Sequence, residues 1–307
     1  MIAPFRTVLV PLDGSAASAY AIPFAAGAAA PIDGALYLSR VHETAPSGVP
    51  MLGNEPVLDY RADADTRLAQ ADALELVANE AKAATGLAVH WALLDDGVPA
   101  DVLRAHAEDI GADLVVMSTH GRAGVSRAIF GSVTTAVVAA THLPVLVVRP
   151  VGTVPSPPLF YRRIAVLLDG SSLSESVIEP ALRLGSAAAA SLELVRVVVP
   201  TPIPMAPGAM PLAMVDPDEY EREVTVAGEY LERVAATVRA RGYTVSTRVE
   251  RGTIVAHAIA EYVQRERVDA IAMATHARRG VSRALLGSVA EDVVRHVTKP
   301  VLLYRPE

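Results

Sequence analysis

Short apolar runs of strand length alternate along the chain with longer segments in which Leu, Val and Ala recur at helical spacing. Short β-branched runs of this kind are typical of strands buried on both faces of a sheet. In the first half, we expect strands at residues 7–12, 36–41, 89–94, 114–117 and 145–148. We expect helices at residues 15–30, 59–85, 99–108 and 133–140. Ser15 is the predicted N-cap of the first helix.

The alternation of strands and helices predicts an α/β fold with a mostly parallel, doubly wound five-stranded sheet covered by helices on both faces. Such sheets bind ligands beyond the carboxyl ends of the strands, where the strand order reverses. Asp13 and Gly121 both follow the ends of predicted strands. We therefore expect a binding site at that edge of the sheet.

The whole pattern occurs twice. VLVPLDGS, which contains Asp13, returns as IAVLLDGS, which contains Asp169, after 156 residues. STHGRAGVSRAIFGSV, beginning at Ser118, returns after the same interval as ATHARRGVSRALLGSV, beginning at Ala274. This period is far too long for a solenoid, so each copy is a whole domain.

The domain organisation follows from this repeat. We expect a first domain at residues 1–150, a proline-containing linker at 151–163 and a second domain at 164–307. Prolines in the linker disfavour both helix and central strand, which favours a short, semi-extended connection.

Composition narrows the functional class. The absence of cysteine excludes disulfides and thiolate metal sites and fits a reducing compartment. A net charge of −7 argues against a general nucleic-acid binder. The sequence has neither a signal peptide pattern nor an apolar stretch of about 20 residues. We therefore expect a cytoplasmic protein without a membrane or nucleic-acid partner.

Gly121, Gly131 and Ser132 frame the loop between a predicted buried strand and the next helix. Glycines let backbone N–H groups approach a phosphate, and a helix N-terminus adds N–H donors and a positive dipole end. The alternative is that both glycines only serve tight turns. Ser132 either contacts a phosphate or caps the helix. Asp13 either accepts hydrogen bonds from an adenine amino group or a ribose hydroxyl, or complements a helix dipole.

Together, the D-G-S strand end, the glycine loop with its G-S exit and the final P-V-L-V-V strand resemble the universal stress protein family in both halves. The first half is most similar to the ATP-binding branch. The resemblance implies that Pro11 and Asp13 flank adenine and that Val41 offers it backbone contacts. It implies that Gly121, Gly131, Ser132 and Val133 hold ribose and phosphates, with Mg²⁺ carried in by the nucleotide. Met117, Ser118 and Arg122 complete the expected nucleotide-binding set, and the guanidinium of Arg122 suits a phosphate.

The second copy departs from the family pattern. Its pocket is expected around Asp169 and Val197. Ala274 and Ala277 replace the two loop glycines, whereas Gly287, Ser288 and Val289 remain; in the first copy, Ser118 already replaces one glycine. A methyl group at a point of close backbone approach crowds a phosphate. The second pocket is therefore expected to bind weakly, to bind something smaller or to stay empty.

The family resemblance implies a stress response protein that binds ATP in a regulatory role, chiefly through the first domain. An enzyme is not expected, because there is no Walker motif and no evident general base, and no metal site of protein ligands alone is expected. A slow ATPase and a nucleotide-free dimerisation scaffold stay open as alternatives. In the family, the final strand usually mediates dimerisation, which implies an intrachain pseudo-dimer here and allows a homodimer.

Overall fold

The computed structural model describes residues 2–29, 34–42, 51–52, 55–56, 60–119, 131–157, 159–201, 216–275 and 287–306. The chain divides into two compact units. Residues 4–160 form one unit, and residues 161–307 form the other together with residues 1–3. Within the described residues, no helix combines the length and the apolar character needed to cross a bilayer.

The first unit is built on parallel strands. In chain order they are β1 (Thr7–Pro11), β2 (Ala35–Val41), β5 (Ala88–Leu94), β6 (Leu114–Ser118) and β7 (Val145–Val148). They lie side by side in the order β7-β6-β1-β2-β5, and every pairing in this series is parallel. The strand order therefore reverses between β1 and β6. Two short strands outside this series, β3 (Met51–Leu52) and β4 (Glu55–Pro56), pair with each other.

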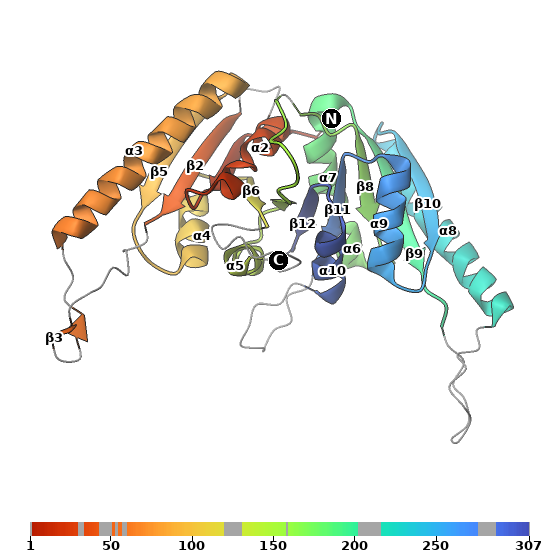
Figure 1. The fold of residues 1–307 in the computed structure, drawn as a ribbon. Coiled ribbons are helices and arrows are strands. Elements are labelled where there is room, and N and C mark those ends of the chain that lie inside the picture. Colours follow the sequence, from red (N-terminus) through yellow and green to blue (C-terminus); the bar gives the residue numbers. More distant parts are fainter. Residues whose placement is uncertain are drawn as a thin grey trace. The chain divides into compact units, whose positions relative to one another are not determined.

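Helices cover both faces of this sheet. They are α1 (Ala16–Ala19), α2 (Ile22–Ala29), α3 (Tyr60–Thr85), α4 (Pro99–Asp109) and α5 (Ser132–Ala140). α2 contacts α3, and α4 contacts α5, so that the helices form two layers (Figure 1). Strands β1 and β6 are buried nearly throughout because they lie between these layers.

The second unit repeats the architecture. Its strands are β8 (Arg163–Leu167), β9 (Ser191–Val198), β10 (Val245–Arg251), β11 (Ala270–Ala274) and β12 (Val301–Tyr304). Their order is β10-β9-β8-β11-β12, again all parallel, with the reversal between β8 and β11. The helices are α6 (Ser172–Glu175), α7 (Ile178–Gly185), α8 (Pro217–Ala240), α9 (Val255–Glu266) and α10 (Ser288–His296), with a 3₁₀ turn η1 (Ser186–Ala188). The predicted fold class of two tandem doubly wound domains is confirmed, while the pseudo-dimer stays a prediction.

One expected helix is wrong in detail. Residues 15–30 were predicted as a single helix, but α1 ends at Ala19 and α2 begins at Ile22. Pro23 explains the break, because it lacks the N–H that would bond to the Ala19 carbonyl and its ring would clash there. The N-cap is confirmed, since the Ser15 hydroxyl accepts a hydrogen bond from the Ser18 N–H at 3.1 Å.

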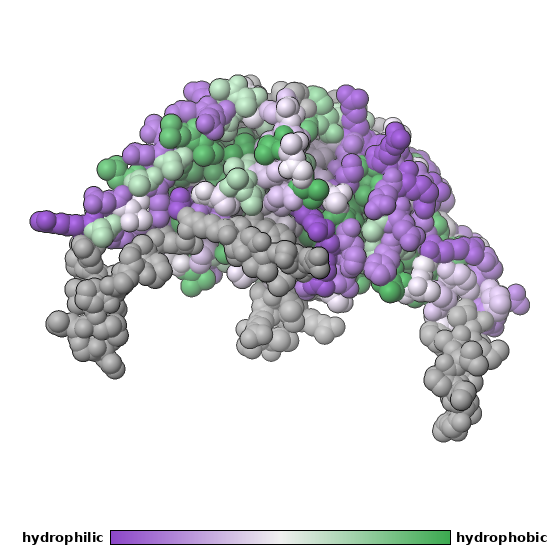
Figure 2. Space-filling view, in the orientation of Figure 1, coloured by the Kyte–Doolittle hydropathy of each residue, from purple (hydrophilic) through white to green (hydrophobic). Residues whose placement is uncertain are grey.

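The two units differ in the side chains that one face of the sheet carries. In the second unit, the nearly buried Glu193 carboxylate pairs with Arg163 at 3.4 Å and Arg248 at 3.3 Å. Hydrophilic residues dominate the surface over α9 in Figure 2. In the first unit, Tyr37 occupies the position equivalent to Glu193 and stacks on His90 with a centroid distance of 4.7 Å. The repeats have therefore kept the fold while exchanging an ion-pair cluster for an aromatic one.

Candidate functional site

An aspartate follows the first strand of each unit and is held in the same way. The Asp169 Oδ1 atom accepts hydrogen bonds from the Ser171 backbone N–H at 2.9 Å and from the Ser171 hydroxyl at 2.6 Å. Asp13 makes the same contacts with Ser15 at the same distances. Gly170, with φ of 96°, provides the tight turn that brings the carboxylate back onto the start of α6.

These contacts set the protonation of Asp169. Burial alone would raise the pKa of the carboxyl, but hydrogen bonds from the Ser171 hydroxyl and N–H, together with Ser174, outweigh burial and hold the pKa below its usual value. Asp169 is therefore a fixed anion and hydrogen-bond acceptor at the carboxyl end of β8.

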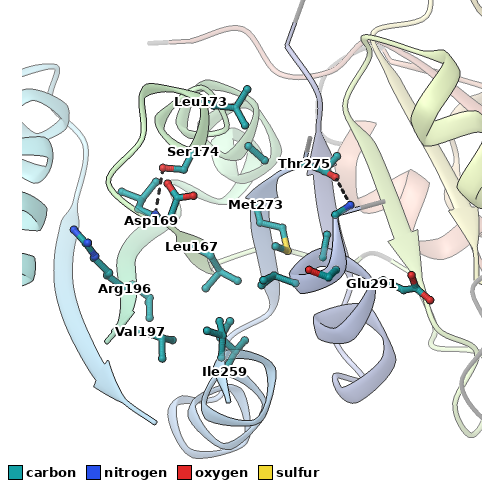
Figure 3. A pocket seen from close by; sticks show the side chains of 18 residues that line it. Leu167, Asp169, Leu173, Ser174, Arg196, Val197, Ile259, Met273, Thr275 and Glu291 are labelled. Carbon is teal, nitrogen blue, oxygen red and sulfur yellow. Dashed lines mark hydrogen bonds between the residues drawn. The ribbon is translucent and has the colours of Figure 1, made fainter. Parts of the chain in front are cut away.

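A pocket of about 530 Å³ opens beside this aspartate in the second unit. Its volume lies within the roughly 300–1,000 Å³ of typical small-molecule sites. The pocket lies at the carboxyl ends of β8, β9 and β11, where the strand order reverses, and the starts of α9 and α10 complete it (Figure 3). This is the location that doubly wound sheets use for ligands.

The predicted residues of the second copy gather at this pocket. The lining includes Asp169, Val197, Ala274, Gly287, Ser288 and Val289. Ala277 lies outside the described residues. The repeat thus pointed to side chains that tertiary structure brings together from four separate elements.

Several lining residues were missed by the sequence reasoning. They are Leu167, Leu168, Leu173, Ser174, Val195, Arg196, Val255, Ile259, Met273, Thr275, Ala290 and Glu291. Arg196 and Thr275 are direct neighbours of the predicted Val197 and Ala274 near the ends of β9 and β11. Including the neighbours of each predicted strand-end residue would therefore have identified both. Val255 and Ile259 come from the start of α9, to which no motif pointed.

Two charged side chains of the pocket, Arg196 and Glu291, lie at opposite ends. Figure 3 shows Arg196 on the side of β9 and Glu291 on the side of α10, where its side chain extends toward the rim. The Arg196 guanidinium lies over the ring of Tyr230 at 5.4 Å. The Tyr230 hydroxyl donates to Glu175 at 3.0 Å, and burial together with this contact raises the pKa of Tyr230 to about 12.

Glycines begin the helices that face each site. The Gly287 N–H donates to the Thr275 hydroxyl at 3.3 Å, and the Gly131 N–H donates to the Thr119 carbonyl at 2.8 Å. A Cβ at position 131 would lie 2.8 Å from that carbonyl, so this turn requires glycine. The capping role considered for Ser132 is wrong: Gly131 is the N-cap, Ser132 is the first helical residue, and no side chain caps α5.

The predicted residues of the first unit lie at one edge of its sheet, because β1, β2 and β6 are neighbours that end there. Pro11 ends β1, Val41 ends β2, and the buried Met117 and Ser118 end β6. Asp13 follows β1, and Gly131, Ser132 and Val133 begin α5. Gly121 and Arg122 lie outside the described residues.

No protein metal centre is evident among the described side chains, where no three His, Asp or Glu residues converge.

Comparison with known proteins defines the family. The model of the universal stress protein family matches residues 4–149 and 160–305. A universal stress protein of Mycolicibacterium smegmatis is 27% identical over 97% of this chain and 97% of its own length. Another, from Methanocaldococcus jannaschii, is 32% identical over 47% of this chain and 82% of its own length. The crystal structure of a universal stress protein from Archaeoglobus fulgidus has the same fold, with a TM-score of 0.67, 18% identity and 98% of both chains covered. The chain therefore belongs to the universal stress protein family and carries two copies of the family domain in tandem.

Proposed function

We propose that this protein binds adenine nucleotide, with ATP as its main ligand, and that nucleotide occupancy serves a regulatory role. The observation that carries the proposal is the pocket at the switch point of the second unit, which is lined by six of the residues that the family resemblance implies. The first unit holds the equivalent residues at the same edge of the same fold. It also keeps Gly121, which the second unit replaces with alanine, so we assign the triphosphate chiefly to the first domain.

The described groups fit an adenine nucleotide. Leu167, Ile259 and Met273 offer apolar contacts for a purine ring. The Asp169 carboxylate is an acceptor for ribose hydroxyls or an exocyclic amine. The first N–H groups of an α-helix have no acceptor inside the helix, and no side chain caps α5 or α10. These donors suit a phosphate, and Mg²⁺ would then be bound through the phosphate oxygens.

We propose binding rather than catalysis as the role. The aspartates nearest the two sites accept hydrogen bonds from the hydroxyls of Ser15 and Ser171. These hydroxyls also cap α1 and α6, so both pairs serve the start of a helix. A cytoplasmic location belongs to this proposal as well.

The test is titration calorimetry with ATP, with and without Mg²⁺, on the intact protein and on Asp13→Asn. Asparagine keeps the Oδ1 acceptor for Ser15 but removes the charge, so the turn survives. We expect micromolar binding, about −8 kcal/mol, weakened about tenfold or more in the variant.

Asp113→Asn is the matched control. The Asp113 carboxylate accepts backbone N–H groups of Arg6 and Thr7 at 3.1 and 3.0 Å, at the opposite, amino-terminal edge of the sheet. This variant should leave ATP affinity within about twofold. Absence of heat, together with absence of nucleotide released on denaturation, would favour the scaffold alternative, and measurable ADP production would favour the ATPase.

A further inference from the structure

The two helices that begin the candidate phosphate sites differ in charge. α5, with the sequence SVTTAVVAA, has no acidic residue in its first turn. α10, with the sequence SVAEDVVRH, carries Glu291 in its first turn and Asp292 directly after it. The equivalent positions in the first unit are Thr135 and Ala136.

This difference changes what each helix N-terminus can accept. A helix N-terminus stabilises one nearby anion through its dipole and its unpaired N–H groups. In α10, Glu291 already supplies that anion from within the helix, and it also lines the pocket. In α5, the helix contributes no such charge, so its N-terminus remains suited to an external phosphate.

The carboxylates of α10 are only partly neutralised. Arg295 pairs with Glu291 at 2.7 Å and with Asp292 at 3.5 Å, so one guanidinium serves two carboxylates. Arg196, the cation among the described lining residues, does not compensate, because it lies at the far end of the pocket, over Tyr230 (Figure 3). A triphosphate laid along the start of α10 would meet net negative charge at the described side chains.

The body of the pocket favours a different ligand. Apolar side chains from β8, β9, α9 and β11 form its walls, including Leu167, Val195, Ile259 and Met273. The Asp169 carboxylate beside them accepts hydrogen bonds, which suits sugar hydroxyls and an exocyclic amine.

We propose that the second-domain pocket takes a purine nucleoside without phosphates, whereas the first domain takes the nucleotide. The inference rests on the proposed function of nucleotide binding. The tandem chain would then respond to two chemical states of one metabolite class, with the nucleotide bound in one copy and the dephosphorylated nucleoside in the other.

Calorimetry with adenosine and with ATP on the full chain tests this assignment. We expect about two equivalents of adenosine and one tight equivalent of ATP per chain. The double variant Glu291→Thr/Asp292→Ala copies α5 and should strengthen ATP binding at the second site by about tenfold. The reciprocal Thr135→Glu/Ala136→Asp should weaken ATP binding at the first site by a similar factor. Glu179→Thr, which removes an exposed carboxylate from α7, is the matched control and should change neither ligand.

The site is assigned with Ala274→Leu, which places a larger side chain in the pocket and should remove one equivalent of adenosine. Circular dichroism checks that this variant is folded. If neither ligand binds the wild-type protein, the proposed function itself fails. If ATP fills both sites of the wild-type protein, nucleotide binding stands and this inference is wrong. The inference is also wrong if the wild-type protein binds one equivalent of ATP and Glu291→Thr/Asp292→Ala does not strengthen ATP binding at the second site.

Discussion

The carboxylate of Asp169 is joined to Ser171 twice, through the backbone N–H at 2.9 Å and through the hydroxyl at 2.6 Å. The same serine hydroxyl accepts the Ser174 N–H at 3.1 Å and so caps α6. Asp13 and Ser15 repeat the arrangement in the first unit. One short motif therefore both starts a helix and fixes an acceptor at the ligand edge of the sheet.

The folded state lowers the pKa of Asp169, so the ionised carboxylate stabilises the second unit and this stabilisation is lost in acid. An unfolded aspartate titrates near pH 3.9. The stability that ionised Asp169 contributes is thus fully present above about pH 5 and is lost as the pH falls through the lower folded-state pKa. Carboxyl NMR of the native protein should find the Asp169 pKa below that of a free aspartate.

The melting temperatures of Asp169→Asn and of the wild type should therefore approach each other as the pH falls below about 4. Asp95→Asn serves as the control, because that carboxylate is 96% exposed in its pair with Arg67. A difference between Asp169→Asn and wild type that stays constant down to about pH 2 would contradict the assignment.

Removal of the Ser171 hydroxyl should have two separable effects. Ser171→Ala abolishes the cap of α6 and is expected to lower the free energy of unfolding of the second unit by about 1 kcal/mol. It also removes a hydrogen bond to Asp169, so the pKa of that carboxyl should move up. Urea unfolding measures the first effect and NMR titration the second. Ser171→Thr should retain most of both, and loss of both in this variant would mean that packing, not the hydroxyl, matters.

Two helical glycines should respond to alanine with opposite signs. A Cβ on Gly27 would lie 2.5 Å from the Leu159 carbonyl oxygen, so Gly27→Ala should destabilise the first unit by roughly 1–3 kcal/mol. A Cβ on Gly228 in α8 meets nothing closer than 3.9 Å, so Gly228→Ala should stabilise the second unit by roughly 0.5–1 kcal/mol.

The single tryptophan makes these measurements separable. Trp91, the only tryptophan in the sequence, lies on β5 of the first unit, so its fluorescence follows that unit alone. Gly27→Ala should shift the fluorescence transition in urea to lower concentration, while Gly228→Ala should leave it unchanged and move only the circular dichroism signal. Equal shifts of both signals in either variant would show that the units unfold together.

His42 is expected to hold α3 on the first sheet. The residue follows Val41 and is buried, with Nδ1 2.9 Å from the Gln70 amide oxygen and Nε2 2.9 Å from the Asp63 carboxylate. Both partners belong to α3. His42→Ala leaves Gln70, itself largely buried, without this contact and should lower the stability of the first unit by about 2 kcal/mol or more.

A double-mutant cycle of His42→Ala with Gln70→Ala, followed by Trp91 fluorescence, isolates this contact. We expect a coupling free energy of roughly 0.5–3 kcal/mol. Simple additivity of the two single variants would mean that the hydrogen bond contributes no stability of its own.

The sequence pattern located nearly all of the strands, because strands buried on both faces leave an uninterrupted apolar run. Strand 145–148 agrees with β7 at both ends, and each of the other four differs from its strand by one residue at one end. The break between α1 and α2 was not predicted, because the alanine-rich segment favours helix throughout and a proline is tolerated in the first turn of a new helix. Whether Pro23 ends one helix or begins another depends on how the chain packs against β1.

For the site, the order of residues along the chain was enough to identify the repeat, the aspartate at each strand end and the glycine that begins each final helix, since these residues stand in short motifs that recur at a fixed interval. Folding was needed to bring Arg196, Ile259 and Met273 to one pocket and to set Arg196 and Glu291 at opposite ends of it. Distances between side chains from β9, α9, β11 and α10 depend on the order of the strands and the packing of helices upon them. No local pattern of residues encodes that order, because it arises from burying the apolar faces of all these elements at once.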